Sequence, residues 1–166
     1  MAVKSFEKIN VNDILAQAGI SRATFYRHFM DKYDLLDQAV IDQVDLIYTD
    51  DCDLDLWRER FADMFELIKK KEMLLAMGHK YEAEHLYTMH YQMVRRLCLK
   101  RMNRVKGGVV TDQEMRAIKF FSAGVAKILV DWTQNGYVVP ARILAGECSD
   151  FFPPVLKKAM SSPKEG

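Results

Sequence analysis

The sequence predicts an all-α protein with a small N-terminal domain, residues 1–48, and a larger helical domain, residues 49–166. Only 4 prolines and 8 glycines interrupt the chain, and the long stretches between them repeat apolar residues at helical spacing. Apolar residues make up 49% and charged residues 28%, which indicates a packed core rather than a disordered chain. No run of alternating β-branched residues indicates a sheet.

Bulk charge does not by itself indicate a nucleic-acid-binding protein, because the formal net charge is only +1. Cys52, Cys98 and Cys148 have no paired spacing, so we expect free thiols in a reducing compartment. Neither a signal-peptide pattern nor a run long enough to cross a bilayer is present. We therefore expect a cytoplasmic protein without membrane contact, and no motif predicts a cofactor or a metal.

A tight, glycine-containing turn at residues 18–21 joins two short predicted helices, as in a helix-turn-helix. Asn10 is a good N-cap for the first helix, and Asp13 stands three residues further on, where it completes a capping box. Gly19 follows the last periodic residue and can end the helix in a left-handed conformation.

The second short helix, residues 22–29, is predicted to follow the N-cap Ser21. Phe25 and Phe29 lie four residues apart on one face and are expected to point into the core. The helix would then present its other side, which carries small and polar residues, to solvent or to a ligand.

That other side suits DNA. At its N-terminal end, Arg22 can fork onto a guanine, while Ala23 and Thr24 can touch a thymine methyl group in the major groove. Three further side chains are placed to bond phosphate oxygens, which fix register without reading sequence: Tyr26, Arg27 and His28.

A third helix is predicted from Lys32 to about Ile47, with Asp31 as its cap. Lys32 adds its charge to the amides and positive dipole of that helix N-terminus, which makes it a suitable phosphate contact. This helix should link the first domain to the second.

These residues together form a specific pattern: Ala18-Gly19-Ile20-Ser21, then Thr24-Phe25-Tyr26-Arg27-His28-Phe29, Asp31-Lys32 and Leu35-Leu36. The pattern resembles the DNA-binding signature of the TetR family of transcriptional regulators and runs through residues 10–36 without a gap. The resemblance implies a homodimer that binds a near-palindromic operator in double-stranded DNA and usually represses transcription. It also implies a C-terminal domain that dimerises and usually holds a small effector.

The resemblance also implies residue roles by position. Four residues fall where members of the family touch bases: Arg22, Ala23, Thr24 and Tyr26. Tyr26, His28 and Lys32 fall where they touch phosphates, and Asn10 or Asn12 is expected to join them from the preceding helix.

The start of the chain departs from the family pattern. The family has a long first helix packed across the other two, but only nine residues precede Asn10, so residues 3–9 can supply about two turns. We therefore expect a truncated first helix. The alternative function is a ligand-binding or dimerisation module, derived from such a regulator, whose DNA binding is impaired.

Further helices are predicted after an aspartate-rich stretch at residues 48–55. We interpret this stretch as a solvated linker rather than a calcium loop, because it lacks the glycine and distal glutamate of such a loop. The predicted body helices span about 57–77 and 81–103, then 111–136, which opens with a Thr111–Glu114 capping box. Prolines at 140 and 153–154 introduce two shorter helices.

Residues 120–139 resemble the end of the penultimate helix in a subset of TetR-like C-terminal domains. This weaker resemblance implies that the last two long helices pair with their copies in a second subunit. Small residues would permit close approach there: Ser122, Ala123, Gly124 and Ala126. Tight packing of these residues within one subunit is the alternative.

The 10 methionines make an adaptable interior that can leave a pocket for an apolar or aromatic effector. The candidate walls of that pocket are Trp57, Phe61, Met64, Tyr87, Met89, Tyr91, Met93 and Phe121. A core filled by its own side chains explains the same residues equally well.

No pattern in the sequence indicates an enzyme. A Ser-His-Asp order, a phosphate-binding loop and a nucleophile motif are all missing. His85 and His90 lie five residues apart and so do not share a helix face as a metal-binding pair would.

Overall fold

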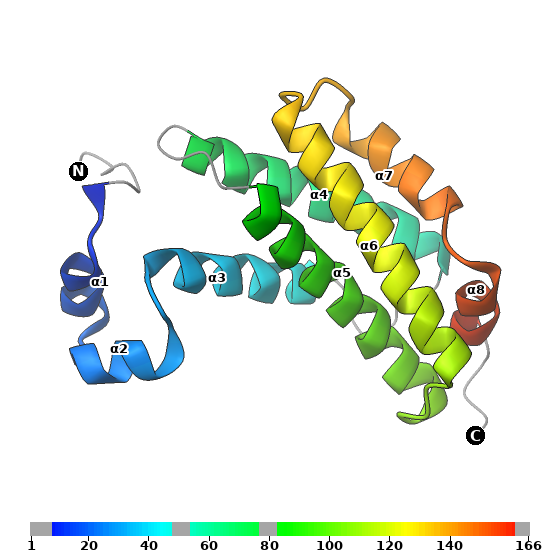
Figure 1. The fold of residues 1–166 in the computed structure, drawn as a ribbon, viewed down its shortest axis with the longest axis horizontal. Coiled ribbons are helices and arrows are strands. Elements are labelled where there is room, and N and C mark those ends of the chain that lie inside the picture. The colour runs from blue at the N-terminus through cyan, green and yellow to red at the C-terminus, as the bar shows by residue number, and fades with distance from the viewer. Residues whose placement is uncertain (1–7, 48–53, 77–82, 162–166) are drawn as a thin grey trace.

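The computed structural model describes residues 8–47, 54–76 and 83–161, and within these ranges it contains eight helices and no strand (Figure 1). The helices are α1 (Val11–Ala18), α2 (Arg22–His28), α3 (Lys32–Ile47), α4 (Leu54–Ala76), α5 (Ala83–Lys106), α6 (Asp112–Gln134), α7 (Ala141–Asp150) and α8 (Pro154–Ser161). The predicted all-α class is therefore confirmed.

The helices form a small group at one end of the molecule and a larger body. Figure 1 shows α1 and α2 together at one end, with α3 leading from them to the body of α4 to α8. In the body, α5 packs along α6 and α4 packs along α7, while α8 contacts α4, α5 and α6. Since α3 touches both α4 and α5, it connects the two parts.

Local chemistry sets the helix ends in the body. α5 continues to Lys106, beyond the predicted end near residue 103, because no helix-breaking residue comes before Gly107. Gly107 and Gly108 then take positive φ values of 64° and 92°, a conformation that glycine adopts without a steric penalty. The predicted Thr111–Glu114 capping box is present at the start of α6.

The prolines act as predicted. Pro140 is the N-cap of α7, and α8 begins at Pro154. Most of the aspartate-rich stretch, and with it the boundary predicted between residues 48 and 49, lies outside the described residues.

Aromatic rings fill the centre of the body. The ring centroid of Phe61 lies 5.1 Å from that of Phe65 and 6.2 Å from that of Phe121, and Phe65 lies 5.8 Å from Trp132. The indole N–H of Trp132 donates to the backbone carbonyl of Val139 at 2.7 Å. These rings join α4 to α6, and α5 packs along α6 while α7 packs along α4.

Cys98 and Cys148 are free thiols, as predicted, and both are buried. Burial raises the pKa of each thiol to about 12, so both are protonated and unreactive near neutral pH. Cys52 lies outside the described residues. Among the helices that the structure describes, none is both long and apolar enough to traverse a bilayer.

Glu114 is a buried acid that serves the cap of α6. One carboxylate oxygen lies 2.7 Å from Nζ of Lys106, and the other accepts from the backbone N–H of Thr111 at 2.8 Å. Burial acts to raise the pKa of Glu114, but the hydrogen bonds from Lys106 and Thr111 outweigh it and hold that pKa below its usual value.

We expect Glu114→Gln to lower the free energy of unfolding at pH 7 by about 1 kcal/mol, measured by urea denaturation. Because the pKa is lower in the folded state, the carboxylate stabilises the fold above the unfolded value of 4.5, and this stabilisation is lost as the pH falls through the folded value. The difference from wild type should therefore narrow in acid. Glu147→Gln on the exposed side of α7 is the control, and a pH-independent difference would contradict the assignment.

Candidate nucleic-acid interface

Helix α1 begins and ends as the sequence predicts. Oδ1 of Asn10 accepts from the backbone N–H of Asp13 at 2.9 Å, and Oδ2 of Asp13 accepts from the backbone N–H of Asn10 at 3.0 Å. Gly19 has φ 66° in the left-handed region and donates to the carbonyl of Leu15. This reciprocal cap and the glycine turn set the angle at which the chain enters α2.

Helix α2 is held by one buried ring. Ser21 is its N-cap, and its Oγ accepts from the backbone N–H of Thr24 at 3.1 Å. Phe25 is only 1% exposed, which confirms its predicted inward direction, whereas Phe29 is half-buried. Phe29 also ends the helix in an extended conformation, one residue earlier than predicted, and its ring lies 5.5 Å from that of Phe25.

The opposite side of α2 faces solvent. Five of the predicted DNA-contacting side chains there are exposed: Arg22, Ala23, Tyr26, Arg27 and His28. Tyr26 is 48% exposed, and its ring stands edge-on to that of Phe25 at 5.3 Å. Thr24 is half-buried and shares a 2.9 Å hydrogen bond with the Ser21 hydroxyl.

Arg22 is oriented by the preceding helix. Its Nη2 donates to Oδ1 of Asn12 on α1 at 2.6 Å, a contact between two exposed side chains. Asn12, predicted as a phosphate contact, thus lies next to the residue predicted to read a base. This hydrogen bond joins α1 and α2 through two exposed side chains.

Lys32 lies at the start of α3 and reaches back toward α1. Its Nζ donates to the backbone carbonyl of Ile9 at 2.8 Å. Asp31 caps α3 as predicted, since its Oδ1 accepts from the backbone N–H of Tyr33 at 2.8 Å and of Asp34 at 2.9 Å. Lys32 therefore ties the first turn of α3 to the segment that precedes α1, close to the exposed Asn10.

Polar contacts hold α3 to α5, and the sequence interpretation did not foresee them. Nε2 of His85 lies 2.7 Å from Oδ2 of Asp37, and Nη2 of Arg96 lies 2.7 Å from Oδ2 of Asp45. Burial raises the pKa of Asp37, although the neighbouring His85 acts to lower it. His85 and Arg96 of α5 thus anchor α3, the helix that connects the small N-terminal group to the body.

The predicted effector-pocket residues divide into two groups. Five are buried in the body core: Trp57, Phe61, Met64, Met93 and Phe121. The other three are half-buried on α5, where Tyr87 stacks on Tyr91 with centroids 6.2 Å apart: Tyr87, Met89 and Tyr91. Whether a pocket opens among them remains a prediction.

The two histidines of α5 lie in different surroundings. His85 is exposed and lies beside Asp37 of α3, whereas His90 is fully buried. Among the described residues, no cluster of three His, Cys, Asp or Glu side chains is arranged to hold a metal ion.

Comparison with protein families decides the identity of the chain. Residues 1–39 match the model described as bacterial regulatory proteins, tetR family, and residues 55–153 match a model described as a transcriptional regulator C-terminal region. The chain belongs to the TetR family. The first match includes all of α1 and α2, which are therefore the helix-turn-helix of a TetR-family transcriptional regulator.

Comparison of this TetR-family chain with curated proteins found no match. The truncated first helix that we expect falls mainly in residues 1–7, outside the described residues. The helix-turn-helix is described from its first cap onward.

We expect Phe25→Ala to unfold α1 and α2 locally, because truncating a buried phenylalanine costs about 3–5 kcal/mol and this small group has no other fully buried ring among its described residues. Amide hydrogen exchange should lose protection in α2 while the body keeps its own. Met30→Ala is the control, because Met30 is 81% exposed in the following turn. Unchanged protection in α2 of the Phe25 variant would contradict this role.

Proposed function

We propose that the protein is a homodimeric repressor that binds a near-palindromic operator and is released by a small-molecule effector. The observation that carries the proposal is the exposed first turn of α2, with Arg22 held by Asn12 at 2.6 Å above the buried Phe25. A helix of this kind enters the major groove with its N-terminal residues at the base edges.

Base reading is assigned to the first turns of α2. Arg22 can form two parallel hydrogen bonds to a guanine, and Asn12 holds its guanidinium before DNA arrives, which lowers the entropy lost on binding. Ala23 is exposed and can meet a thymine methyl group, with Thr24 and Tyr26 alongside it. These four residues are the proposed source of sequence preference.

Phosphate contacts are assigned to side chains around that turn. Lys32 lies at the start of α3, where its Nζ donates to the Ile9 carbonyl at 2.8 Å, and its charge together with the N-terminus of α3 can attract a phosphate. Asn10 uses its side-chain oxygen in the cap and retains its NH₂ group as a donor. The remaining proposed phosphate contacts are Asn12, Tyr26, Arg27 and His28.

We expect Arg22→Ala to relax base preference and Lys32→Ala to weaken binding to all sequences alike, because the first residue reads bases and the second neutralises a phosphate. Selection of duplexes from a random pool gives the preference, and titrations at several salt concentrations give the slope, which should fall by about 1 for Lys32→Ala.

Arg58→Ala is the matched control for these variants, since it removes one exposed positive charge where α4 meets the end of α7. An unchanged preference in the Arg22 variant would remove Arg22 from the base-reading set. If neither this chain nor one extended upstream binds DNA, the impaired ligand-binding or dimerisation module replaces the regulator.

The proposed dimer surface is the outer side of α6, one of the last two long helices, together with that of the shorter α7. It carries exposed apolar side chains, Phe120 at 79%, Ile143 at 55% and Phe151 at 67%, and the exposed Gly124 lies one turn after Phe120. Of the small residues in this part of α6, Ser122 and Ala126 are buried and belong to the packing within the subunit. To bind two half-sites of one operator, the dimer must hold its two α2 helices about 34 Å apart, in successive major grooves.

We expect Phe120→Glu and Ile143→Glu to shift the protein toward monomer in light scattering, because each places a charge in an interface that must be dry. Operator affinity should fall with the dimer fraction, since one subunit contacts one half-site. Val109→Glu is the control, because Val109 is a similarly exposed apolar residue, 68%, in the turn between α5 and α6. A stable dimer in both variants would place the interface elsewhere.

Effector action follows from two-state coupling. An effector weakens DNA binding if it binds more tightly to a dimer whose two helix-turn-helix units are at a separation that does not fit the operator. The loss of DNA affinity cannot exceed the difference between the effector's affinities for the two states. The interior residues around Trp57 and Phe121 are the proposed apolar or aromatic site.

A further inference from the structure

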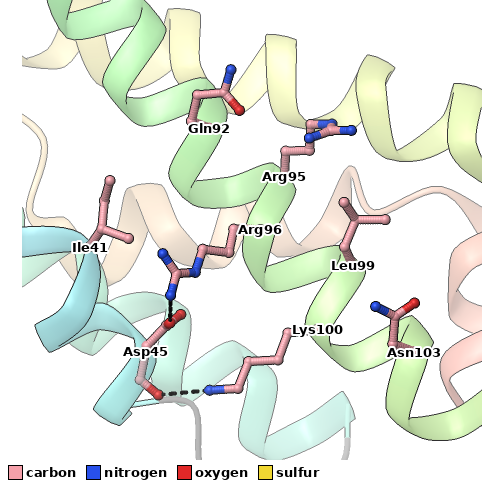
Figure 2. Close-up of a pocket in the computed structure, with 8 residues that line it drawn as sticks. All are labelled: Ile41, Asp45, Gln92, Arg95, Arg96, Leu99, Lys100 and Asn103. Atoms are coloured by element: carbon pink, nitrogen blue, oxygen red, sulfur yellow. Dashed lines mark hydrogen bonds and ion pairs between the residues drawn. The ribbon is translucent and has the colours of Figure 1, made fainter. Parts of the chain in front are cut away.

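A groove of about 640 Å³ lies between α3 and α5, and none of its lining residues belongs to the predicted effector pocket (Figure 2). This volume is within the range of small-molecule sites, about 300–1,000 Å³. The residues of its lining that matter here are Ile41 and Asp45 of α3, and Arg95, Arg96, Leu99 and Lys100 of α5.

Three cationic side chains line the groove, and two of them contact its one acid, Asp45. Arg96 lies 2.7 Å from the Asp45 carboxylate, and Lys100 donates to the Asp45 backbone carbonyl at 3.2 Å (Figure 2). Arg95 is half-buried and makes no hydrogen bond or ion pair within the described part of the chain. The lining therefore has an excess of positive charge, and a half-buried guanidinium with no ion pair among the described residues favours an anion.

Asp45 and the apolar residues of the lining indicate two further features of a ligand that would fit the groove. Oδ1 of Asp45 is buried and accepts no hydrogen bond from the described residues, so it can accept one from a ligand N–H or O–H group. Ile41 and Leu99 are half-buried and pack against the core, which gives the groove an apolar wall.

We propose that this groove binds a small organic anion. Its acidic group bridges Arg95 with Arg96 or Lys100, and its apolar part lies on Ile41 and Leu99. The predicted effector pocket lacks the positive charge of this groove, because its candidate residues are all aromatic or methionine.

Binding here acts on the connector. An anion that recruits Arg96 and Lys100 competes with Asp45, so it loosens the contact between the end of α3 and α5. Since α3 continues from the turn that follows α2, a looser contact between α3 and α5 changes how the helix-turn-helix is held relative to the body. The effect on DNA rests on the proposed function, whereas binding of the anion does not.

The probe is 1-anilinonaphthalene-8-sulfonate, an aromatic anion whose fluorescence rises when it leaves water, compared with its uncharged counterpart N-phenyl-1-naphthylamine. Arg95→Gln should raise the Kd of the sulfonate about tenfold, because it removes a charge-assisted hydrogen bond. Asn103→Asp adds a negative charge to the exposed rim of the groove and should also weaken binding. Asp45→Asn removes the competing charge and should tighten it.

Arg58→Gln, remote from the groove, should leave the Kd unchanged, and the uncharged probe should respond to none of these variants. Melting curves establish that each variant is folded. Arg95 makes no hydrogen bond or ion pair among the described residues, so Arg95→Gln removes none from the fold. This variant therefore tests anion binding even if Asp45→Asn is unstable. Equal sulfonate affinity in wild type, Arg95→Gln and Asn103→Asp would overturn the proposal, because the probe would then bind another apolar surface.

A second measurement tests the coupling. The sulfonate should change the Kd for a selected duplex in wild type and to a lesser extent in Arg95→Gln, and DNA should change the Kd for the sulfonate by the same factor. Sulfonate binding that depends on Arg95 but leaves DNA affinity unchanged would overturn the coupling. Failure of every duplex to bind would instead overturn the proposed function and leave the anion site standing.

Discussion

The burial of Phe25 is the constraint on which the rest of the structure depends. A helix as short as α2 is marginal in water, so its stability and direction come from packing rather than from propensity. With Phe25 1% exposed, the helix has one rotation in which Arg22, Ala23 and Arg27 all face outward. The caps at Asn10 and Ser21 then fix where each helix of the pair begins.

The connector α3 carries a different kind of contact. Val40 and Val44 are buried against the body, but around them α3 is held to α5 by ion pairs and a hydrogen bond to a backbone carbonyl. Such partly exposed polar contacts contribute little to stability and can be exchanged for contacts with a ligand. A joint of this kind would allow the helix-turn-helix to move relative to the body, as the proposed effector response requires.

Sequence reasoning succeeded where the structure is decided locally. The caps at Asn10, Ser21 and Thr111 each involve residues three apart, so the pattern and the hydrogen bond are read from the same few positions. The inward direction of Phe25 followed from helical spacing. Most of the residues of α2 that are proposed to contact DNA lie outside that inward face and are exposed, and their contacts with DNA stay a prediction.

The rest required contacts between distant parts of the chain. Nothing near Arg96 or Lys100 in the sequence indicates that both meet Asp45, because that contact depends on how α3 lies across α5. Likewise, spacing placed Trp57 and Phe121 on inner faces, but spacing cannot distinguish the wall of a pocket from a filled core.

Amide chemical shifts of the labelled protein, titrated with a duplex chosen by selection, test the central claim most directly. If Phe25 holds α2 so that its first turn enters the major groove, the largest changes fall on Arg22 to Tyr26 and on Lys32, with the Phe25 amide keeping its protection from exchange. Changes confined to α6 and α7, or exposure of Phe25 on binding, would contradict the account.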